Sequence, residues 1–149
     1  MKTLWTDGSA SPNPGPGGFA VIYDGKPVRL GREESSTNIR MEGAAMRAAM
    51  QFLDGEEGEI YSDSEFWINV LTKWAPIWQK NGWKKKTGLI KNLNLVKELY
   101  GLYCDSKVKL NWVKGHDGIE MNELTDFWAN KARENEGLGE VTVELVSTE

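Results

Sequence analysis

A chain of 149 residues, 40% of them hydrophobic and 27% charged, has the length and composition of one globular domain with its own core. Cys104 is the only cysteine and His116 the only histidine, which excludes an internal disulfide and a zinc site built from the usual sulfur and nitrogen ligands. The net charge of −4 argues against a surface that binds nucleic acid everywhere, and no apolar run is long enough for a membrane span or a signal peptide.

Strand and helix patterns alternate along the chain. The predicted strands cover 2–6, 19–23, 27–33, 59–62 and 107–113. The predicted helices cover 41–53, 65–73, a short part of 74–91, 92–103 and 122–134. Asp24–Gly25 is a hairpin signal between the second and third strands. We expect one domain over 1–149, with a mixed sheet of an antiparallel hairpin and parallel strands and with helices on its faces. The structure of the tail from about 135 onward is left open, although 140–146 alternates.

The positive charge is concentrated in one window, Phe66–Lys97, which holds seven lysines and no acid and therefore carries +7, while the rest of the chain carries −11. This distribution predicts local binding of a polyanion by an acidic body. Within the window, Trp74, Trp78 and Trp83 stand close together. Neighbouring tryptophans more often form a small core under a helix than a platform for stacked bases, whereas the unbroken lysines favour contact with backbone phosphates.

Four acids are candidates for a metal site made of oxygen ligands, which Mg²⁺ prefers. Asp7 and Asp63 come where predicted strands end, Glu42 lies in the first turn of the first predicted helix, and Asp126 lies in the last helix. Each also has an ordinary interpretation, as a turn residue, a helix cap, an acid favoured by the helix dipole or a surface acid. Because the chain has 22 acids, spacing alone does not select these four.

Several local sequences resemble the motifs of the bacterial type 1 ribonucleases H, in that family's order and spacing. They are TDGSASPNPGPGG at Thr6–Gly18, TNIRME at Thr37–Glu42, YSDS at Tyr61–Ser64, and WVKGHDG with NELTDFWA within Trp112–Ala129. The resemblance implies the ribonuclease H-like fold, a five-stranded mixed sheet flanked by helices. It also implies an endonuclease that hydrolyses the RNA strand of RNA/DNA hybrids with two metal ions and leaves 5′-phosphate and 3′-hydroxyl ends.

The resemblance places the family's metal site on Asp7, Glu42, Asp63 and Asp126. Asp7 would bridge two Mg²⁺ ions, for which Mn²⁺ could substitute; Asp126 would complete the site of the ion that activates water, and the other two acids would hold the second ion. Because four anions repel one another, we expect at least one raised pKa without metal. His116, in a loop with glycines on both sides, would shuttle protons or assist product release rather than bind metal.

The same resemblance assigns substrate contacts to neutral and basic residues. Asn13 and Asn38 would touch the minor groove. Thr37 and Asn92 would hold a DNA-strand phosphate. The basic protrusion of the family, which would pack along the DNA strand, corresponds here to Trp74, Lys80, Lys84, Lys85 and Lys86. Ile39, Ser35 and Phe127 depart from the residues usual in the family, which bears on affinity and rate.

Three other functions are kept as alternatives: a catalytically silent module that binds hybrid, a transposase-like or junction-resolving nuclease, and the ribonuclease H domain of a reverse transcriptase. The first would bind hybrid without cleaving it, and the second would cut DNA. Against the third, the chain opens with Met1 one residue before the first predicted strand. We expect a cytoplasmic monomer that binds RNA/DNA hybrid and no membrane.

Overall fold

The computed structural model describes residues 1–115 and 118–135, so His116 and the tail segment 140–146 lie outside the described residues. The strands are β1 (Lys2–Ala10), β2 (Gly15–Tyr23), β3 (Lys26–Ser36), β4 (Gly58–Ser62) and β5 (Val108–Trp112). The helices are α1 (Asn38–Leu53), α2 (Glu65–Asn69), the π-helical η1 (Val70–Trp74), α3 (Ala75–Lys80), α4 (Leu93–Cys104) and α5 (Glu120–Glu134). In the part of the chain just defined, no helix combines the length and apolar character needed to cross a membrane.

The strands form one mixed sheet in the order β3-β2-β1-β4-β5. The pairs β1–β2 and β2–β3 are antiparallel, whereas β4 runs parallel to both β1 and β5. Asp24 and Gly25 join β2 to β3 with φ of 56° and 75°, the left-handed values that a tight hairpin turn of the primed type requires. The predicted mixed sheet and hairpin are confirmed.

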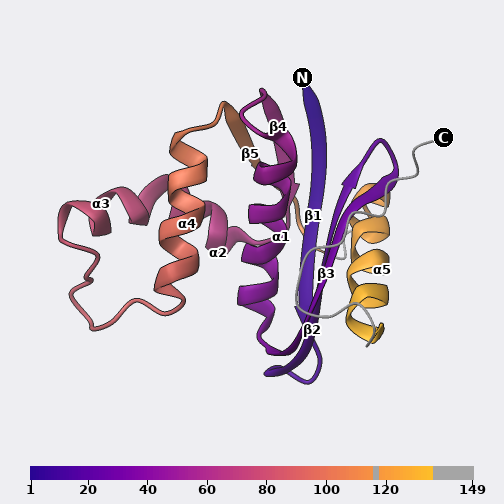
Figure 1. Cartoon of the computed structure of the whole chain (residues 1–149), viewed down its shortest axis with the longest axis horizontal. Coiled ribbons are helices and arrows are strands. Elements are labelled where there is room, and N and C mark those ends of the chain that lie inside the picture. The colour runs from indigo at the N-terminus through magenta and orange to yellow at the C-terminus, as the bar shows by residue number, and fades with distance from the viewer. Residues whose placement is uncertain (116–117, 136–149) are drawn as a thin grey trace.

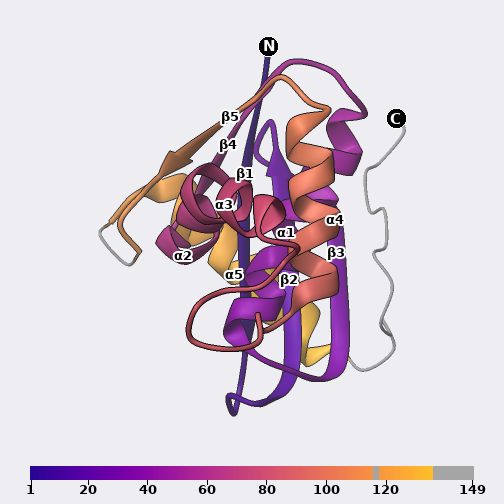
Figure 2. The same ribbon diagram turned by 90° about the vertical axis from the view of Figure 1, so that its left-hand side faces the viewer.

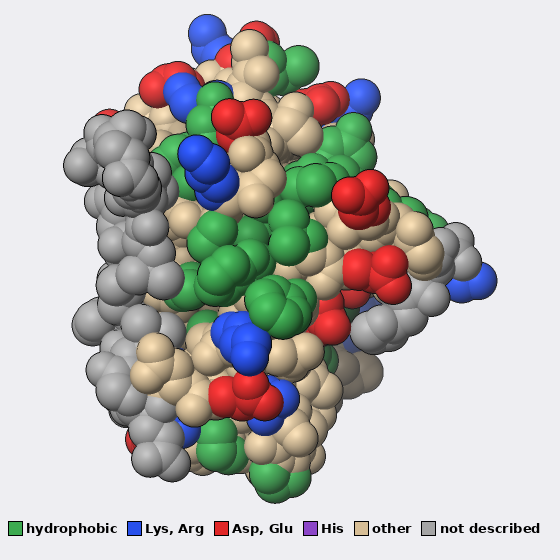
Figure 3. All heavy atoms as spheres, turned by 90° about the vertical axis from the view of Figure 1, so that its right-hand side faces the viewer, with side chains coloured by type: hydrophobic (Ala, Val, Ile, Leu, Met, Phe, Trp, Pro, Cys, Tyr) green, Lys and Arg blue, Asp and Glu red, His purple; other side chains and the backbone are tan. Residues whose placement is uncertain are grey.

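Helices cover both faces of the sheet (Figures 1 and 2). α1 and α4 lie on one face, where α1 packs on β1 and β2, and α5 lies on the other, against β1, β2 and β3. Figure 3 views the α5 side and shows hydrophobic side chains in the middle of this face with acidic ones at their border. Phe127 on α5 is half-exposed there. Because β1 is central and covered on both faces, a side chain on β1 can meet residues from either layer.

α1 begins earlier than its apolar stripe predicts. Thr37 is its N-cap, and the Thr37 side-chain oxygen accepts a hydrogen bond from the N–H of Arg40. The helix ends at Leu53 because Asp54 takes a left-handed backbone conformation. Glu42 therefore lies in the second turn, and its predicted place in the first turn, where the helix dipole favours an acid, is wrong.

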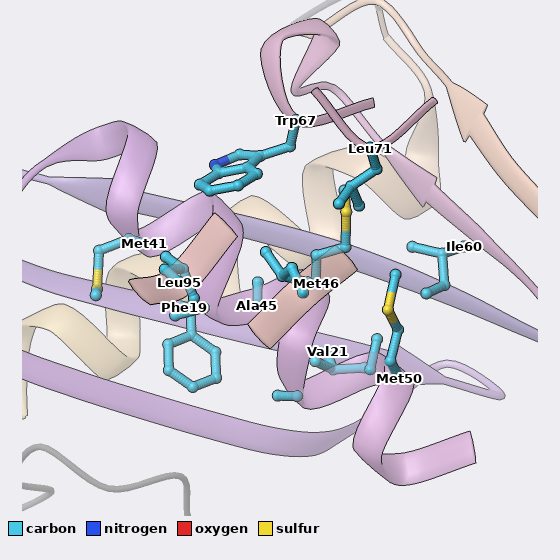
Figure 4. Packing of buried hydrophobic residues seen from close by; sticks show 14 of the residues in the cluster. Phe19, Val21, Met41, Ala45, Met46, Met50, Ile60, Trp67, Leu71 and Leu95 are labelled. Atoms are coloured by element: carbon cyan, nitrogen blue, oxygen red, sulfur yellow. The ribbon is translucent and has the colours of Figure 1, made fainter. Parts of the chain in front are cut away.

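The main core fills the space between the sheet and the α1 layer (Figure 4). Trp67 of α2 is fully buried there, and its indole N–H donates to the backbone carbonyl of Ile39 at 2.6 Å. Gly43 of α1 makes room for this ring, since a Cβ at Gly43 would lie 2.6 Å from the Trp67 ring. This packing fixes α2, and with it the end of β4, against the start of α1.

Trp74, Trp78 and Trp83 of the basic window differ in how deeply they are buried. Trp78 and Trp83 are partly buried and pack against the main core, which agrees with the predicted small core. Trp74 is 49% exposed, so the prediction that all three form a core is wrong for this residue. The reason is local: η1 and α3 extend beyond the sheet (Figure 1), and only one side of them meets α4.

Candidate active site

Two of the four candidate acids lie where the parallel part of the sheet ends. Thr6 of β1 pairs with Ser62 of β4, and this is the last parallel pair between the two strands. Asp7 is the next residue on β1, and Asp63 is the first residue after β4. The prediction that Asp7 follows a strand is wrong, because β1 continues to Ala10 and Asp7 pairs with Ala20 of β2. The carboxylates are nevertheless neighbours, since both lie just beyond the carboxyl end of the parallel ladder.

Glycines on β1 and β2 let helices from both layers approach this point. A Cβ at Gly8 would lie 2.3 Å from the carbonyl carbon of Met41 and 2.6 Å from the N atom of Glu42. On the other face, a Cβ at Gly18 would lie 2.3 Å from the N atom of Arg133. α1 and α5 therefore pack with their backbones directly on the sheet, which brings Glu42 and Asp126 to the level of Asp7.

The carboxylates influence one another electrostatically. Asp7 is only 7% exposed, and burial, together with the charge of Asp63 and the side chain of Asp126, raises its pKa well above the usual range. One N–H, that of Gly8, donates to Asp7 Oδ1 at 2.9 Å and opposes this shift. Burial, and secondarily the charge of Asp63, raises the pKa of Glu42 to about 7, against a hydrogen bond from Ser64. The prediction of at least one raised pKa is confirmed, but burial, and not repulsion among the acids, is the larger cause for both residues.

The donor set fits hard divalent cations. All four side chains offer oxygen, and two of them hold raised pKa values that a neighbouring cation would lower. No three acidic, histidine or cysteine side chains among residues 1–115 and 118–135 are grouped closely enough to form a ready three-ligand site. Mg²⁺ tolerates this, because it keeps several waters and is usually bound by one or two carboxylates together with substrate phosphates.

The family model described as RNase H matches residues 1–134. The chain belongs to the RNase H family. A ribonuclease H of Methylorubrum extorquens is 38% identical over 138 residues, which are 89% of this chain and 60% of that longer protein. A ribonuclease H of Syntrophomonas wolfei is 41% identical over 136 residues, which are 87% of this chain and 93% of that protein.

The fold is shared with LC9-RNase H1, described as a type 1 RNase H with the type 2 active-site motif. The two structures superpose with a TM-score of 0.76 at 24% identity, over 96% of this chain and 76% of that one. The predicted ribonuclease H-like fold is confirmed. The chain is thus a type 1 ribonuclease H, an endoribonuclease of a family that acts on RNA/DNA hybrids and uses divalent metal ions.

The predicted groove residues of this ribonuclease H connect the first hairpin loop to α1. The side-chain oxygen of Asn13 accepts from the N–H of Asn38 at 3.0 Å, and the side-chain oxygen of Asn38 accepts from the N–H of Ala10 at 2.7 Å. Thr37 caps α1, and Asn92 lies at the N-cap of α4 in a left-handed conformation. The structure thus assigns Asn13, Asn38 and Thr37 clear structural roles, and their substrate contacts stay predictions.

The basic window forms a groove beside α3. The groove has a volume of about 690 Å³, and Lys84, Lys85 and Lys86 border it. Its apolar lining includes Trp74 and also Phe66 and Ile77, which are 47% and 49% exposed. The exposure of Phe66 and Ile77 was not predicted, because an apolar residue in a helical pattern predicts burial. Lys80 is exposed at the end of α3 and does not line the groove.

The segment after β5 runs next to Asp63. A Cβ at Gly115 would lie 2.9 Å from Asp63 Oδ2, so any larger residue there would require the Asp63 carboxylate to shift. His116 is the next residue in the chain and lies outside the described residues. Its predicted auxiliary role stays a prediction.

Proposed function

We propose that this ribonuclease H hydrolyses the RNA strand of RNA/DNA hybrids by a two-metal-ion mechanism and leaves 5′-phosphate and 3′-hydroxyl ends. The observation that carries the proposal is that Asp7 is buried on the central strand with the acids Asp63 and Asp126 as neighbours, and that Asp63 also acts on the largely buried Glu42. A structural acid gains nothing from burial beside other acids, because their repulsion disfavours the charged form. Bound cations would offset this repulsion and favour the ionised carboxylates.

Asp7 is the acid best placed to contact both ions. It lies on the central strand and interacts with both Asp63 and Asp126. Asp126 would complete the site of one ion, and Glu42 with Asp63 would hold the second, since the charge of Asp63 acts on Glu42 as well. Bound there, divalent cations, Mg²⁺ or in its place Mn²⁺, would supply the positive charge that favours attack of water on the phosphate and departure of the 3′-oxygen.

Residues outside the metal site would bind the nucleic acid and place its backbone beside the cations. Lys84, Lys85 and Lys86 are exposed and carry no ion pair to an acid among the described residues. The segment between α3 and α4, to which they belong, lies on the side of α4 away from the sheet (Figure 1). Backbone phosphates of the DNA strand are suitable partners for these side chains. Asn13 and Asn38 would meet the minor groove, where the 2′-hydroxyl distinguishes RNA from DNA. Thr37 and Asn92, at the N-terminal ends of two helices on the same face, would hold a phosphate.

The experiment compares four labelled substrates: RNA/DNA hybrid, RNA duplex, single-stranded RNA and DNA duplex, each with Mg²⁺ and with a chelator. We expect cleavage of RNA in the hybrid alone, and none with the chelator. Binding of hybrid without cleavage would instead support a silent module, and cleavage of the DNA duplex would support a resolvase-like enzyme.

The variant Asp7→Asn tests the metal assignment. We expect it to lose Mg²⁺-dependent cleavage while it still binds hybrid, because the change removes one negative charge but little volume. Gel-shift or anisotropy measurements in Ca²⁺ would follow binding. Turnover by Asp7→Asn close to that of the unmodified enzyme would contradict the two-metal mechanism.

A further inference from the structure

Asn130 lies one helical turn after Asp126 on α5. Its side-chain nitrogen donates to Asp126 Oδ2 at 3.3 Å. Its side-chain oxygen accepts from the hydroxyl of Ser9 on β1 and from the Nη2 of Arg133, each at 3.3 Å. The neutral side chain of Asn130 thus links the carboxylate of Asp126 to the central strand and to the guanidinium of Arg133. The spacing of four residues between Asp126 and Asn130 on a predicted helix was the only local signal in the sequence for this contact.

The neighbours of Asn130 determine which way its amide points. A guanidinium only donates hydrogen bonds, and an ionised carboxylate only accepts them. An amide between Arg133 and Asp126 satisfies both only when its oxygen faces Arg133 and its nitrogen faces Asp126. The reversed amide would set oxygen against oxygen and N–H against N–H. The hydroxyl of Ser9 can donate, so it fits the same orientation.

Rigid elements hold this network in place. Ser9 pairs with Gly18 across the β1–β2 ladder. The helix backbone packs on Gly18, where a Cβ would lie 2.6 Å from the carbonyl oxygen of Ala129. The turn of α5 that carries Asn130 is therefore pressed against the sheet beside Ser9. All members of the network are partly buried, which limits competition from water.

We propose that Asn130 is a positioning residue that fixes the carboxylate of Asp126 for metal binding opposite Asp7. The inference rests on the proposed metal role of Asp126. Arg133 acts on Asp126 through a neutral amide, so the carboxylate is restrained without a direct ion pair that would compete with a cation for its charge. Hydrogen-bond partners of metal-binding groups commonly set the orientation of those groups in this way.

The test measures Mg²⁺ binding to the full chain without nucleic acid, by isothermal titration calorimetry. Because the bond to Asp126 is a neutral-donor bond of 3.3 Å, we expect Asn130→Ala to weaken Mg²⁺ binding about 3- to 10-fold. The Mg²⁺ concentration for half-maximal cleavage should rise by the same factor. Saturating Mg²⁺ should restore most of kcat, and KM for hybrid should stay within about twofold.

Two further variants separate positioning from general damage. Gln51→Ala removes a neutral polar side chain from an exposed position of α1 and should leave Mg²⁺ affinity unchanged. Ser9→Ala acts on the same network, so the effects of Ser9→Ala and Asn130→Ala should be clearly less than additive in the double variant. Additive effects, or an Asn130→Ala affinity equal to that of Gln51→Ala, would overturn the proposal.

Asp126→Asn distinguishes this failure from failure of the proposed function. If Asp126→Asn weakens Mg²⁺ binding strongly and Asn130→Ala does not, the positioning role is wrong and the metal site stands. If neither variant changes Mg²⁺ binding, the assignment of Asp126 to the metal site is wrong, and the role of Asn130 falls with it.

Discussion

The pKa of Glu42 makes a quantitative prediction about stability without metal. Burial raises this pKa from 4.5 to about 7 in the folded protein. Between these values the folded protein keeps a proton that the unfolded chain has released. The free energy of unfolding must therefore fall as pH rises through this window, and the contribution of Glu42 levels off about one pH unit above its folded-state pKa.

The magnitude follows from the size of the shift. A difference of one pKa unit corresponds to about 1.4 kcal/mol, so Glu42 would lower the free energy of unfolding by at most about 3–4 kcal/mol from below pH 4.5 to above pH 7. Solvent reduces this value because the side chain is only partly buried. Burial also raises the pKa of Asp7, and its contribution has the same sign. Low pH should therefore stabilise the metal-free protein relative to neutral pH.

Urea unfolding at pH 5, 6, 7 and 8 in EDTA would measure the effect. The variant Glu42→Gln should be more stable than the unmodified protein at pH 8, and the gap should close toward pH 5. Glu57→Gln, which changes an exposed acid, is the matched control and should follow the unmodified protein. Saturating Mg²⁺ should flatten the pH dependence of the unmodified protein, because a cation favours the ionised carboxylates. Equal slopes for Glu42→Gln and the unmodified protein in EDTA would refute the reasoning.

Two other predictions concern the substrate surface and the packing under the site. Replacing Lys84, Lys85 and Lys86 with alanine should raise KM for the hybrid and leave kcat nearly unchanged. For the unmodified protein we expect the logarithm of the binding constant to fall with the logarithm of the salt concentration at a slope of roughly −3, and the triple variant should have a flatter slope. An unchanged slope would exclude these lysines from the binding surface. Gly8→Ala should destabilise the protein by about 2–3 kcal/mol in thermal or urea unfolding, because the new Cβ would overlap the backbone of α1. Gly101→Ala, on an open side of α4, should instead stabilise by about 0.5–1 kcal/mol, and equal effects of the two changes would contradict the packing argument.

Local sequence determined much of the fold. Strand patterns in the sequence located all five strands, and Asp24–Gly25 indicated the hairpin, because left-handed turn residues are recognisable one by one. Boundaries were less certain. β1 extends past Asp7 since Asp7–Ala10 pair with β2, and a pairing partner distant in the sequence is not visible in a local pattern. The same holds for Trp74, whose exposure depends on how far α3 extends from the sheet.

The candidate site was likewise determined partly by the sequence and partly by the tertiary structure. The sequence by itself indicated the acids, because their motifs stand in a recognisable order, and it established that any metal here needs oxygen ligands in a chain with one cysteine and one histidine. Only the tertiary structure decided how those acids act on one another. Gly8 and Gly18 let α1 and α5 pack directly on the sheet, and burial then raises the pKa of Asp7 and Glu42. The Ser9 hydroxyl donates a hydrogen bond to Asn130, which lies 121 positions later in the sequence. Burial and charge interactions depend on distances in space, which a linear pattern does not contain.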